Sequence, residues 1–165
     1  MQIIVLDIII TVFIQSIVEK HNKNTALITG PGFIFQICSL ASGGTWQFEA
    51  GYGTAKGAQL KFALHLMEES AARVQEGKRL IYSRAVCPGT TDTPFWNRIP
   101  QRDADPATTL TADNVAWVID TWLDDPDATA EMMNAKKPRN DIVIKRHHPF
   151  EFWDGIMAIA HESHP

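Results

Sequence analysis

The chain has 165 residues, 45% of them hydrophobic, and a formal net charge of −4 from 15 basic and 19 acidic side chains. This length and composition predict one globular domain with a sizeable core. No basic run could neutralise several phosphates in a row, which argues against a nucleic-acid partner. The two cysteines, Cys38 and Cys87, have neither a disulfide-framework nor a zinc-site spacing, so we expect a reducing, cytoplasmic setting and no metal site.

The first 18 residues form an apolar run whose single charge is Asp7. Gln15 and Ser16 interrupt this run before it reaches the roughly 20 apolar residues that a membrane-spanning helix needs. The segment also lacks the basic start and small-residue cleavage site of a secretory signal. We therefore expect a buried or interfacial helix, with a membrane anchor and a signal as the alternatives.

Strand-type and helix-type segments alternate after this first helix. Residues 33–38 are aromatic and β-branched and predict a buried strand. Residues 52–72 predict a helix that ends before Gly77, because their apolar side chains recur at helical spacing: Leu60, Ala63, Leu64, Met67 and Ala71. Residues 80–87 predict a second buried strand, which Pro88 and Gly89 end.

The second half of the chain continues the alternation. Residues 90–108 have no periodicity and predict a long loop, and Thr111 is a candidate N-cap for a helix that ends at Asp124. A weak helix or loop follows, then a short last strand at 142–144 and an aromatic tail. The order of helix, strand, helix, strand, helix, strand predicts an α/β fold with a parallel sheet.

Tyr52 and Lys56 stand four residues apart on the predicted helix, so the phenol and the ammonium share one face. Tyrosine has an ordinary pKa of about 10, and a nearby cation favours its phenolate form and brings proton transfer within reach of neutral pH. The spacing alone also fits a packed tyrosine beside a solvated lysine. The catalytic interpretation of the pair is supported by other residues, because Ser39 and the Pro88-Gly89 turn each follow a predicted strand. Open parallel sheets keep their ligand sites at that edge.

Three segments carry a resemblance to a known family. Residues 30–39 end a strand in Ser39, residues 51–58 contain Tyr52 and Lys56 in a YxxxK pattern, and residues 85–94 contain a PG-x-x-x-T turn. In this order and at this spacing, the chain resembles the short-chain dehydrogenase/reductase family from its first helix to the strand at 142–144. The resemblance implies a partial Rossmann-like, doubly wound parallel sheet over residues 1–146, with residues 147–165 as a C-terminal tail.

The resemblance also implies roles for these residues in NAD- or NADP-dependent chemistry on a carbonyl or alcohol substrate. Tyr52 would exchange a proton with the substrate oxygen, Ser39 would hydrogen-bond that oxygen, and Lys56 would lower the Tyr52 pKa and hold the nicotinamide ribose. The remaining residues would bind the cofactor or lie over the substrate. They are Pro88, Gly89, Thr91 and Thr93 for the cofactor, and Phe95 and Trp96 for the substrate.

The sequence departs from the family pattern at two places. The family's glycine-rich turn, which receives the pyrophosphate at a helix N-terminus, has no counterpart in this chain, which argues against tight cofactor binding. Ile8 stands where family members usually carry an asparagine that supports a proton-relay water. We expect the chain to be the catalytic portion of such a protein without its cofactor-binding portion, with a true N-terminus further upstream as one explanation.

In the family, a strand of the cofactor-binding portion flanks the strand that corresponds to residues 33–38. Without that portion the strand at 33–38 lies on an open sheet edge, and such an edge favours pairing with another chain. We therefore expect self-association into a homo-oligomer. The alternative to an active reductase is a truncated, catalytically impaired chain that acts as a self-association or interaction module.

Overall fold

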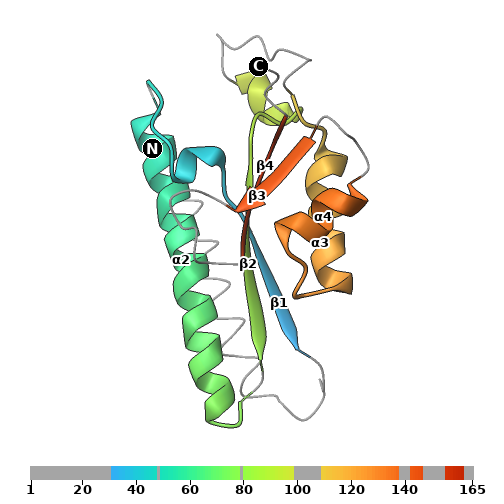
Figure 1. The fold of residues 1–165 in the computed structure, drawn as a ribbon. Helices are drawn as coiled ribbons and strands as arrows, with labels where there is room; N and C mark the ends of the chain where they lie inside the picture. The colour runs from blue at the N-terminus through green and yellow to red at the C-terminus, as the bar shows by residue number, and fades with distance from the viewer. Residues whose placement is uncertain are drawn as a thin grey trace. The chain divides into compact units, whose positions relative to one another are not determined.

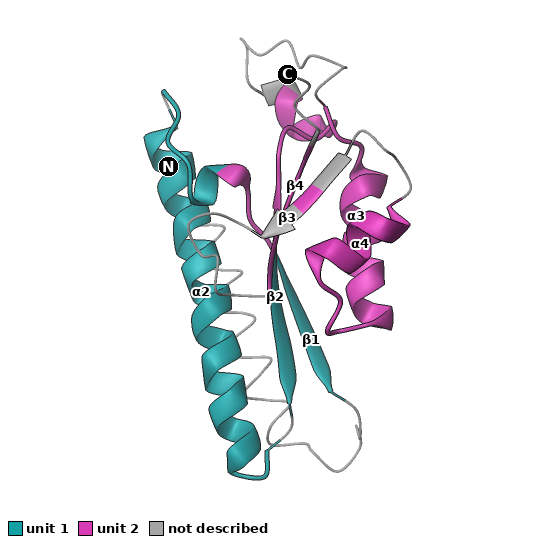
Figure 2. Ribbon diagram, viewed as in Figure 1, with its two compact units in different colours: residues 1–36, 41–85 teal, residues 37–40, 86–165 magenta. Residues whose placement is uncertain are grey.

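The computed structural model describes residues 31–47, 49–78, 80–98, 109–137, 142–146 and 155–161. The predicted first helix, with Asp7 and Ile8, lies outside these residues. The described residues fall into two compact units (Figure 2): residues 31–36 and 41–85 belong to unit 1, and residues 37–40 and 86 onward belong to unit 2.

The strands form one sheet with the order β1-β2-β4-β3 (Figure 1). The strands are β1 (Gly32–Ile37), β2 (Ile81–Pro88), β3 (Ile142–Arg146) and β4 (Ile156–His161). Strands β1, β2 and β4 run parallel, as the α/β prediction requires. The long helix between β1 and β2 provides the crossover that a parallel pair needs.

The prediction for the C-terminal part of the chain was wrong in two respects. The strand predicted at 142–144 pairs with β4 in antiparallel register, with Ile144 opposite Ile159, and is not parallel. Residues 156–161, which we expected to belong to a tail, form β4, and Ile156 and Ile159 are almost completely buried. The strand was missed because Ile156, Met157, Ala158, Ile159 and Ala160 have no alternation, as is typical of a strand covered on both faces.

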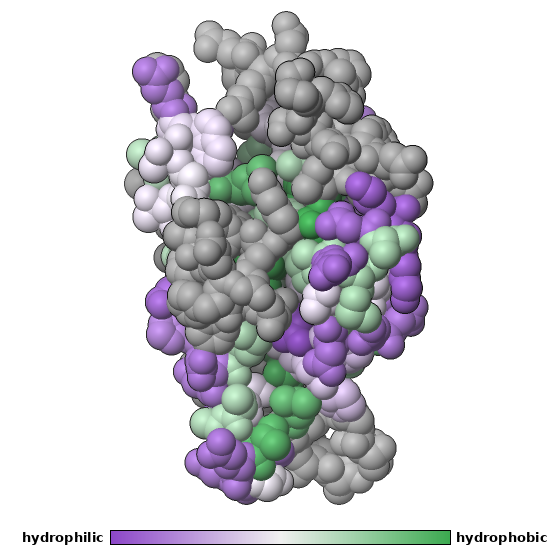
Figure 3. Space-filling model, in the orientation of Figure 1, coloured by the Kyte–Doolittle hydropathy of each residue, from purple (hydrophilic) through white to green (hydrophobic). Residues whose placement is uncertain are grey.

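Unit 1 is built on α2 (Ala50–Gln75), which confirms and extends the predicted helix. Leu60, Ala63 and Leu64 are buried as expected, whereas Met67 is half-buried and Ala71 is exposed. Where grey atoms do not cover the view, Figure 3 shows hydrophobic residues beside the lower part of α2 and hydrophilic residues on the outer side of the helix there. The helix ends just before Gly77, as predicted, and the Gly77 φ of 74° lies in the left-handed region that glycine adopts at low cost.

Two buried serines join α2 to β2 within unit 1. The Ser70 Oγ accepts a hydrogen bond of 2.7 Å from the Ile81 N–H, and the Ser83 Oγ donates one of 2.9 Å to the Ala63 carbonyl. These bonds set the position of the helix along the strand, since each one ties a single residue of α2 to a single residue of β2.

The expectation of a buried strand at 33–38 was wrong for most of β1. Within the strand Gln36 is buried, whereas Phe33 and Phe35 are half-buried and Ile37 is 42% exposed. The Phe33 ring stacks on Tyr82 of β2 with centroids 5.3 Å apart. Among the described strands β1 is the terminal strand of the sheet, which agrees with the predicted edge position and explains why its apolar side chains are incompletely covered.

Unit 2 contains α3 (Ala112–Asp124) and α4 (Ala130–Lys136). Thr111 caps α3 as predicted, and Asn114 completes a capping box by bonding back to the Thr111 backbone. Trp122 is 1% exposed and its indole N–H donates to the Ala128 carbonyl at 3.1 Å, which closes the turn between the helices. The segment expected to be a weak helix or loop is therefore in part a defined helix, α4.

Asn134 attaches α4 to β3. Its side-chain amide donates to the Ile144 carbonyl and accepts a bond of 3.1 Å from the Ile144 N–H. This pair satisfies the backbone groups of one strand residue as a neighbouring strand would, so α4 covers β3 at that point.

Candidate functional site

Tyr52 and Lys56 lie in the first two turns of α2, in unit 1. The Lys56 Nζ is 6.0 Å from the centroid of the Tyr52 ring, and both side chains are half-buried. This is within the range at which a cation is attracted to an aromatic face. The structure thus confirms the helix and the shared face that the four-residue spacing predicted.

Lys56 also donates a hydrogen bond of 2.9 Å to Oε1 of Gln59. Gln59 is not among the residues predicted from the sequence, although a polar residue three positions after a lysine is a recognised helical partner. The bond restrains the lysine side chain on the face of the helix that carries Tyr52. Gln59 is therefore a candidate positioning residue for the pair.

The backbone before α2 passes close to the helix beside Tyr52. A Cβ atom at Gly53 would lie 3.3 Å from the carbonyl oxygen of Ala41, which belongs to the short helix η1 (Leu40–Ser42). That distance is tighter than an ordinary contact, so glycine at position 53 allows η1 and α2 to approach. The neighbouring residue of the YxxxK pattern thus has a structural role of its own.

Ser39 lies between the end of β1 and η1, is half-buried and belongs to unit 2. The preceding residue, Cys38, donates its N–H to the Val86 carbonyl of β2 at 2.7 Å. Ser39 therefore follows a strand end, as predicted, and stands next to the strand that leads into the Pro88-Gly89 turn. The structure describes Ser39 in unit 2 and the Tyr52–Lys56 pair in unit 1.

The turn after β2 is held by hydrogen bonds within unit 2. Pro88 is buried, and the Gly89 N–H donates to the Ile159 carbonyl at 2.8 Å. The Thr91 hydroxyl donates to the Gly89 carbonyl at 3.1 Å. Thr91 also forms an isolated parallel bridge with Leu110, which no sequence signal indicated because the two residues lie far apart in the chain.

Residues 94–98 form a short helix, η2 (Pro94–Arg98), where the sequence predicted an aperiodic loop. The Trp96 indole N–H donates to the Thr91 carbonyl at 2.7 Å, and the Trp96 backbone N–H donates to the Thr93 carbonyl at 3.2 Å. Phe95 packs edge-on against Trp96 and remains 40% exposed. The predicted cofactor and substrate residues that follow β2 are thus brought together in one folded turn. The rest of the predicted loop, residues 99–108, lies outside the described residues.

Cys38 and Cys87 are buried, at 4% and 0% exposed, and no disulfide bond joins them. Across the described ranges, no group of three or more histidine, cysteine or acidic residues is arranged to hold a metal ion. None of the helices in the same ranges combines the length and the apolar character that crossing a bilayer requires.

Comparison of the chain with protein-family models, with curated proteins and with solved structures finds no match.

Proposed function

We propose that the chain is built for NAD- or NADP-linked transfer of hydride between a nicotinamide and a carbonyl or alcohol substrate, in the manner of the short-chain dehydrogenase/reductase family. The observation that carries the proposal is the Lys56 ammonium held 6.0 Å from the Tyr52 ring on one helix face. An ammonium beside a phenol stabilises the negative charge that develops on the oxygen when its proton is transferred. In this proposal the strands and α2 are the later part of a Rossmann-like sheet.

Two residues would act on the substrate oxygen, and Lys56 would act through one of them. Tyr52 donates its phenolic proton to that oxygen when a carbonyl is reduced, and takes a proton back when an alcohol is oxidised. Ser39 donates a hydrogen bond to the same oxygen and polarises the carbonyl. Lys56, restrained by Gln59, keeps a positive charge beside the phenol in both directions.

The residues that would hold the cofactor fit its nicotinamide end. The Lys56 ammonium and the Tyr52 hydroxyl suit a ribose diol, and the Thr93 hydroxyl suits a carboxamide. The nicotinamide, when bound, supplies or accepts the hydride at the substrate carbon. The chain has no glycine-rich turn for a pyrophosphate, so we expect weak cofactor binding, and the pyrophosphate has no assigned residue here.

A matched pair of tyrosine variants tests the proposal, because the chain contains two tyrosines. Tyr52→Phe should lower kcat/KM by about 10²- to 10⁴-fold, the usual contribution of a positioned acid or base. Tyr82→Phe keeps its ring on Phe33 and should leave turnover unchanged. Lys56→Met and the exposed control Lys61→Met form a second pair, in which the first should lower turnover and the second should not.

Turnover is measured by the change in nicotinamide absorbance with millimolar NADH or NADPH and a set of aldehydes, cyclic ketones and quinones. Cofactor binding is measured separately by tryptophan fluorescence. Turnover that survives Tyr52→Phe would refute the assigned mechanism. The absence of cofactor binding and of turnover in the unaltered chain would refute the proposal as a whole.

The second candidate is a self-association module, which the position of β1 favours. Among the described strands β1 ends the sheet, and Ile37 at its C-terminal end is 42% exposed. Terminal strands pair readily with other chains. Light scattering at micromolar concentration tests this candidate. A homo-oligomer without cofactor binding would favour the module, and a monodisperse monomer would exclude it.

A further inference from the structure

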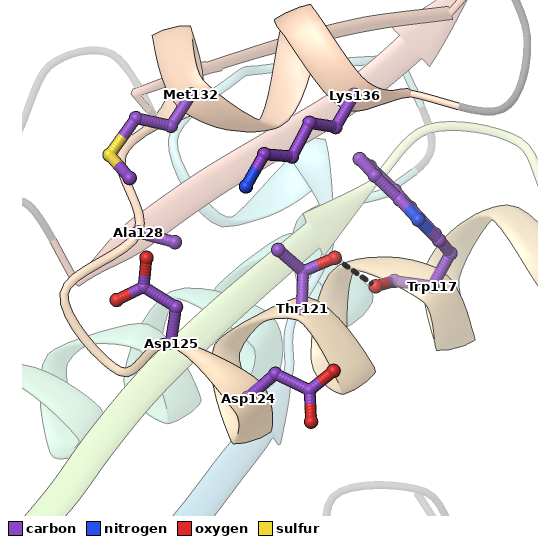
Figure 4. Close-up of a pocket in the computed structure, with 7 residues that line it drawn as sticks. All are labelled: Trp117, Thr121, Asp124, Asp125, Ala128, Met132 and Lys136. Atoms are coloured by element: carbon purple, nitrogen blue, oxygen red, sulfur yellow. Dashed lines mark hydrogen bonds between the residues drawn. The ribbon is translucent and has the colours of Figure 1, made fainter.

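A cleft lies between α3 and α4 in unit 2, and none of the residues assigned to catalysis is among those that line it (Figure 4). One wall is a single stripe of α3, because Trp117, Thr121 and Asp124 recur at helical spacing. The opposite wall is Met132 and Lys136, which stand four residues apart on α4. Asp125 and Ala128, from the connection between the helices, line the remainder.

The cleft carries charges of both signs that do not pair with each other. In the described part of the chain, Lys136 forms no ion pair with Asp124 or with Asp125. Figure 4 shows the Lys136 side chain extending from α4 into the space between the helices, with Asp124 beyond Thr121 and Asp125 on the side of Ala128. The cleft therefore presents a cationic side and an anionic side to whatever occupies it.

The position of the aspartates is electrostatically unfavourable for the helix. Asp124 is the last residue of α3 and Asp125 is its C-cap, and α3 has no basic residue in its last turn. The C-terminal end of a helix carries partial negative charge, which disfavours carboxylates there. Asp125 has a structural role, since its carboxylate accepts the Asp127 N–H at 3.3 Å, but Asp124 is exposed and has none. A ligand ammonium at this end of α3 would relieve the repulsion, and such departures from local rules are characteristic of functional sites.

The size and the apolar wall limit the ligand. The cavity volume is about 190 Å³, below the roughly 300 Å³ at which pockets for drug-sized ligands begin. The Trp117 ring, the Ala128 methyl and the Met132 side chain provide an apolar surface between the two charged sides. We infer that the cleft binds a small linear aminocarboxylate, with its ammonium at Asp124, its carboxylate at Lys136 and its methylene chain against Trp117.

Three ligands of equal chain length separate the contributions: aminocaproate carries both charges, hexylamine carries only the ammonium, and caproate carries only the carboxylate. Binding is followed by the Trp117 indole N–H signal in a proton–nitrogen correlation spectrum, identified as the one of five tryptophan signals that Trp117→Phe removes. Aminocaproate should shift this signal saturably. Hexylamine and caproate should each bind at least about tenfold more weakly, the loss expected from one missing charged contact.

Two variants test the assignment of each end. In Lys136→Gln the affinity for aminocaproate should fall to that for hexylamine, and in Asp124→Asn it should fall toward that for caproate. Lys61→Gln and Asp120→Asn change exposed residues outside the cleft, and each should leave the affinity for aminocaproate unchanged. Because Lys136 and Asp124 are exposed, the spectra of these variants should retain the dispersion of a folded chain.

Three results would overturn the inference. One is a Trp117 signal that does not shift saturably up to about 100 mM aminocaproate, well beyond millimolar affinity. Another is hexylamine or caproate binding as tightly as aminocaproate. The third is a Lys136→Gln variant that binds aminocaproate as the unaltered chain does. None of these results depends on cofactor binding, so the inference stands or fails separately from the proposed reductase function.

Discussion

The hydrogen bonds that hold α2 against β2 lead to a prediction with an internal control. Ser70 and Ser83 are 2% and 1% exposed, and each makes one hydrogen bond between the helix of Tyr52 and the strand. Serine to alanine is the same chemical change at both positions. The two variants differ only in the backbone group that loses its partner, which makes the comparison a test of how buried hydrogen bonds contribute to stability.

Ser70→Ala should be the more destabilising change. It leaves the Ile81 N–H inside the protein without the acceptor it has now, so the desolvation cost of about 1–3 kcal/mol adds to the lost bond, and we expect about 2–3 kcal/mol in total. In Ser83→Ala the Ala63 carbonyl still accepts the helical N–H four residues further on. We therefore expect a loss of about 1 kcal/mol in the free energy of unfolding.

Urea unfolding followed by far-ultraviolet circular dichroism measures both variants, because α2 is the longest described helix. With a slope of about 2 kcal/mol per M, the midpoint should fall by about 1 M for Ser70→Ala and about 0.5 M for Ser83→Ala. Ala71→Ser, on the exposed side of the same helix, should stay within about 0.5 kcal/mol of the unaltered chain. If Ser83→Ala costs as much as Ser70→Ala, the reasoning from the unpaired group is wrong.

Three further predictions concern other parts of the described structure. Thr111→Ala removes the side chain that accepts the Asn114 N–H and should cost about 1 kcal/mol by urea unfolding, whereas Thr45→Ala, at an exposed position outside any helix, should cost less. Asn134→Asp places a carboxylate against the Ile144 carbonyl, so the variant should have a lower free energy of unfolding at neutral pH. This stability should recover as pH falls below about 4, where the protonated acid can donate again. A loss of stability that does not depend on pH would contradict this reasoning. The hydrogen bond and the charge of Lys78 hold the pKa of Glu76 below its ordinary value, so Lys78→Ala should raise that pKa in an NMR titration. The stabilisation from Glu76 is present above its unfolded-state pKa and is lost as pH falls through the folded pKa, and an unchanged titration in Lys78→Ala would contradict this cause.

Local patterns predicted several elements correctly, because their signals lie within a few neighbouring residues. The spacing of Leu60, Ala63 and Leu64 predicted α2, Gly77 predicted its end, and Thr111 predicted the cap of α3. The shared face of Tyr52 and Lys56 follows from helix geometry alone. In each case the helical repeat or the cap chemistry determines the outcome before any tertiary contact forms.

Other features depended on contacts between distant parts of the chain. Strand β4 is stabilised by neighbours on both sides in the order β2-β4-β3, and the antiparallel direction of β3 follows from that pairing. The half-exposed state of Phe33 and Phe35 reflects the terminal position of β1 rather than their hydrophobicity. Burial and strand direction are properties of neighbours, and no local pattern encodes them.

The same division holds for the functional residues. The sequence by itself determined which residue types are available for proton transfer, Ser39, Tyr52 and Lys56, and their order along strand and helix. Only the tertiary structure decided that Thr91 meets Leu110 and that Lys136 faces a cleft with two aspartates at the end of α3. The physical reason is that a helical repeat is set by bonds within one turn, whereas a cleft requires two elements to pack, and packing brings together residues that have no regular separation in the chain.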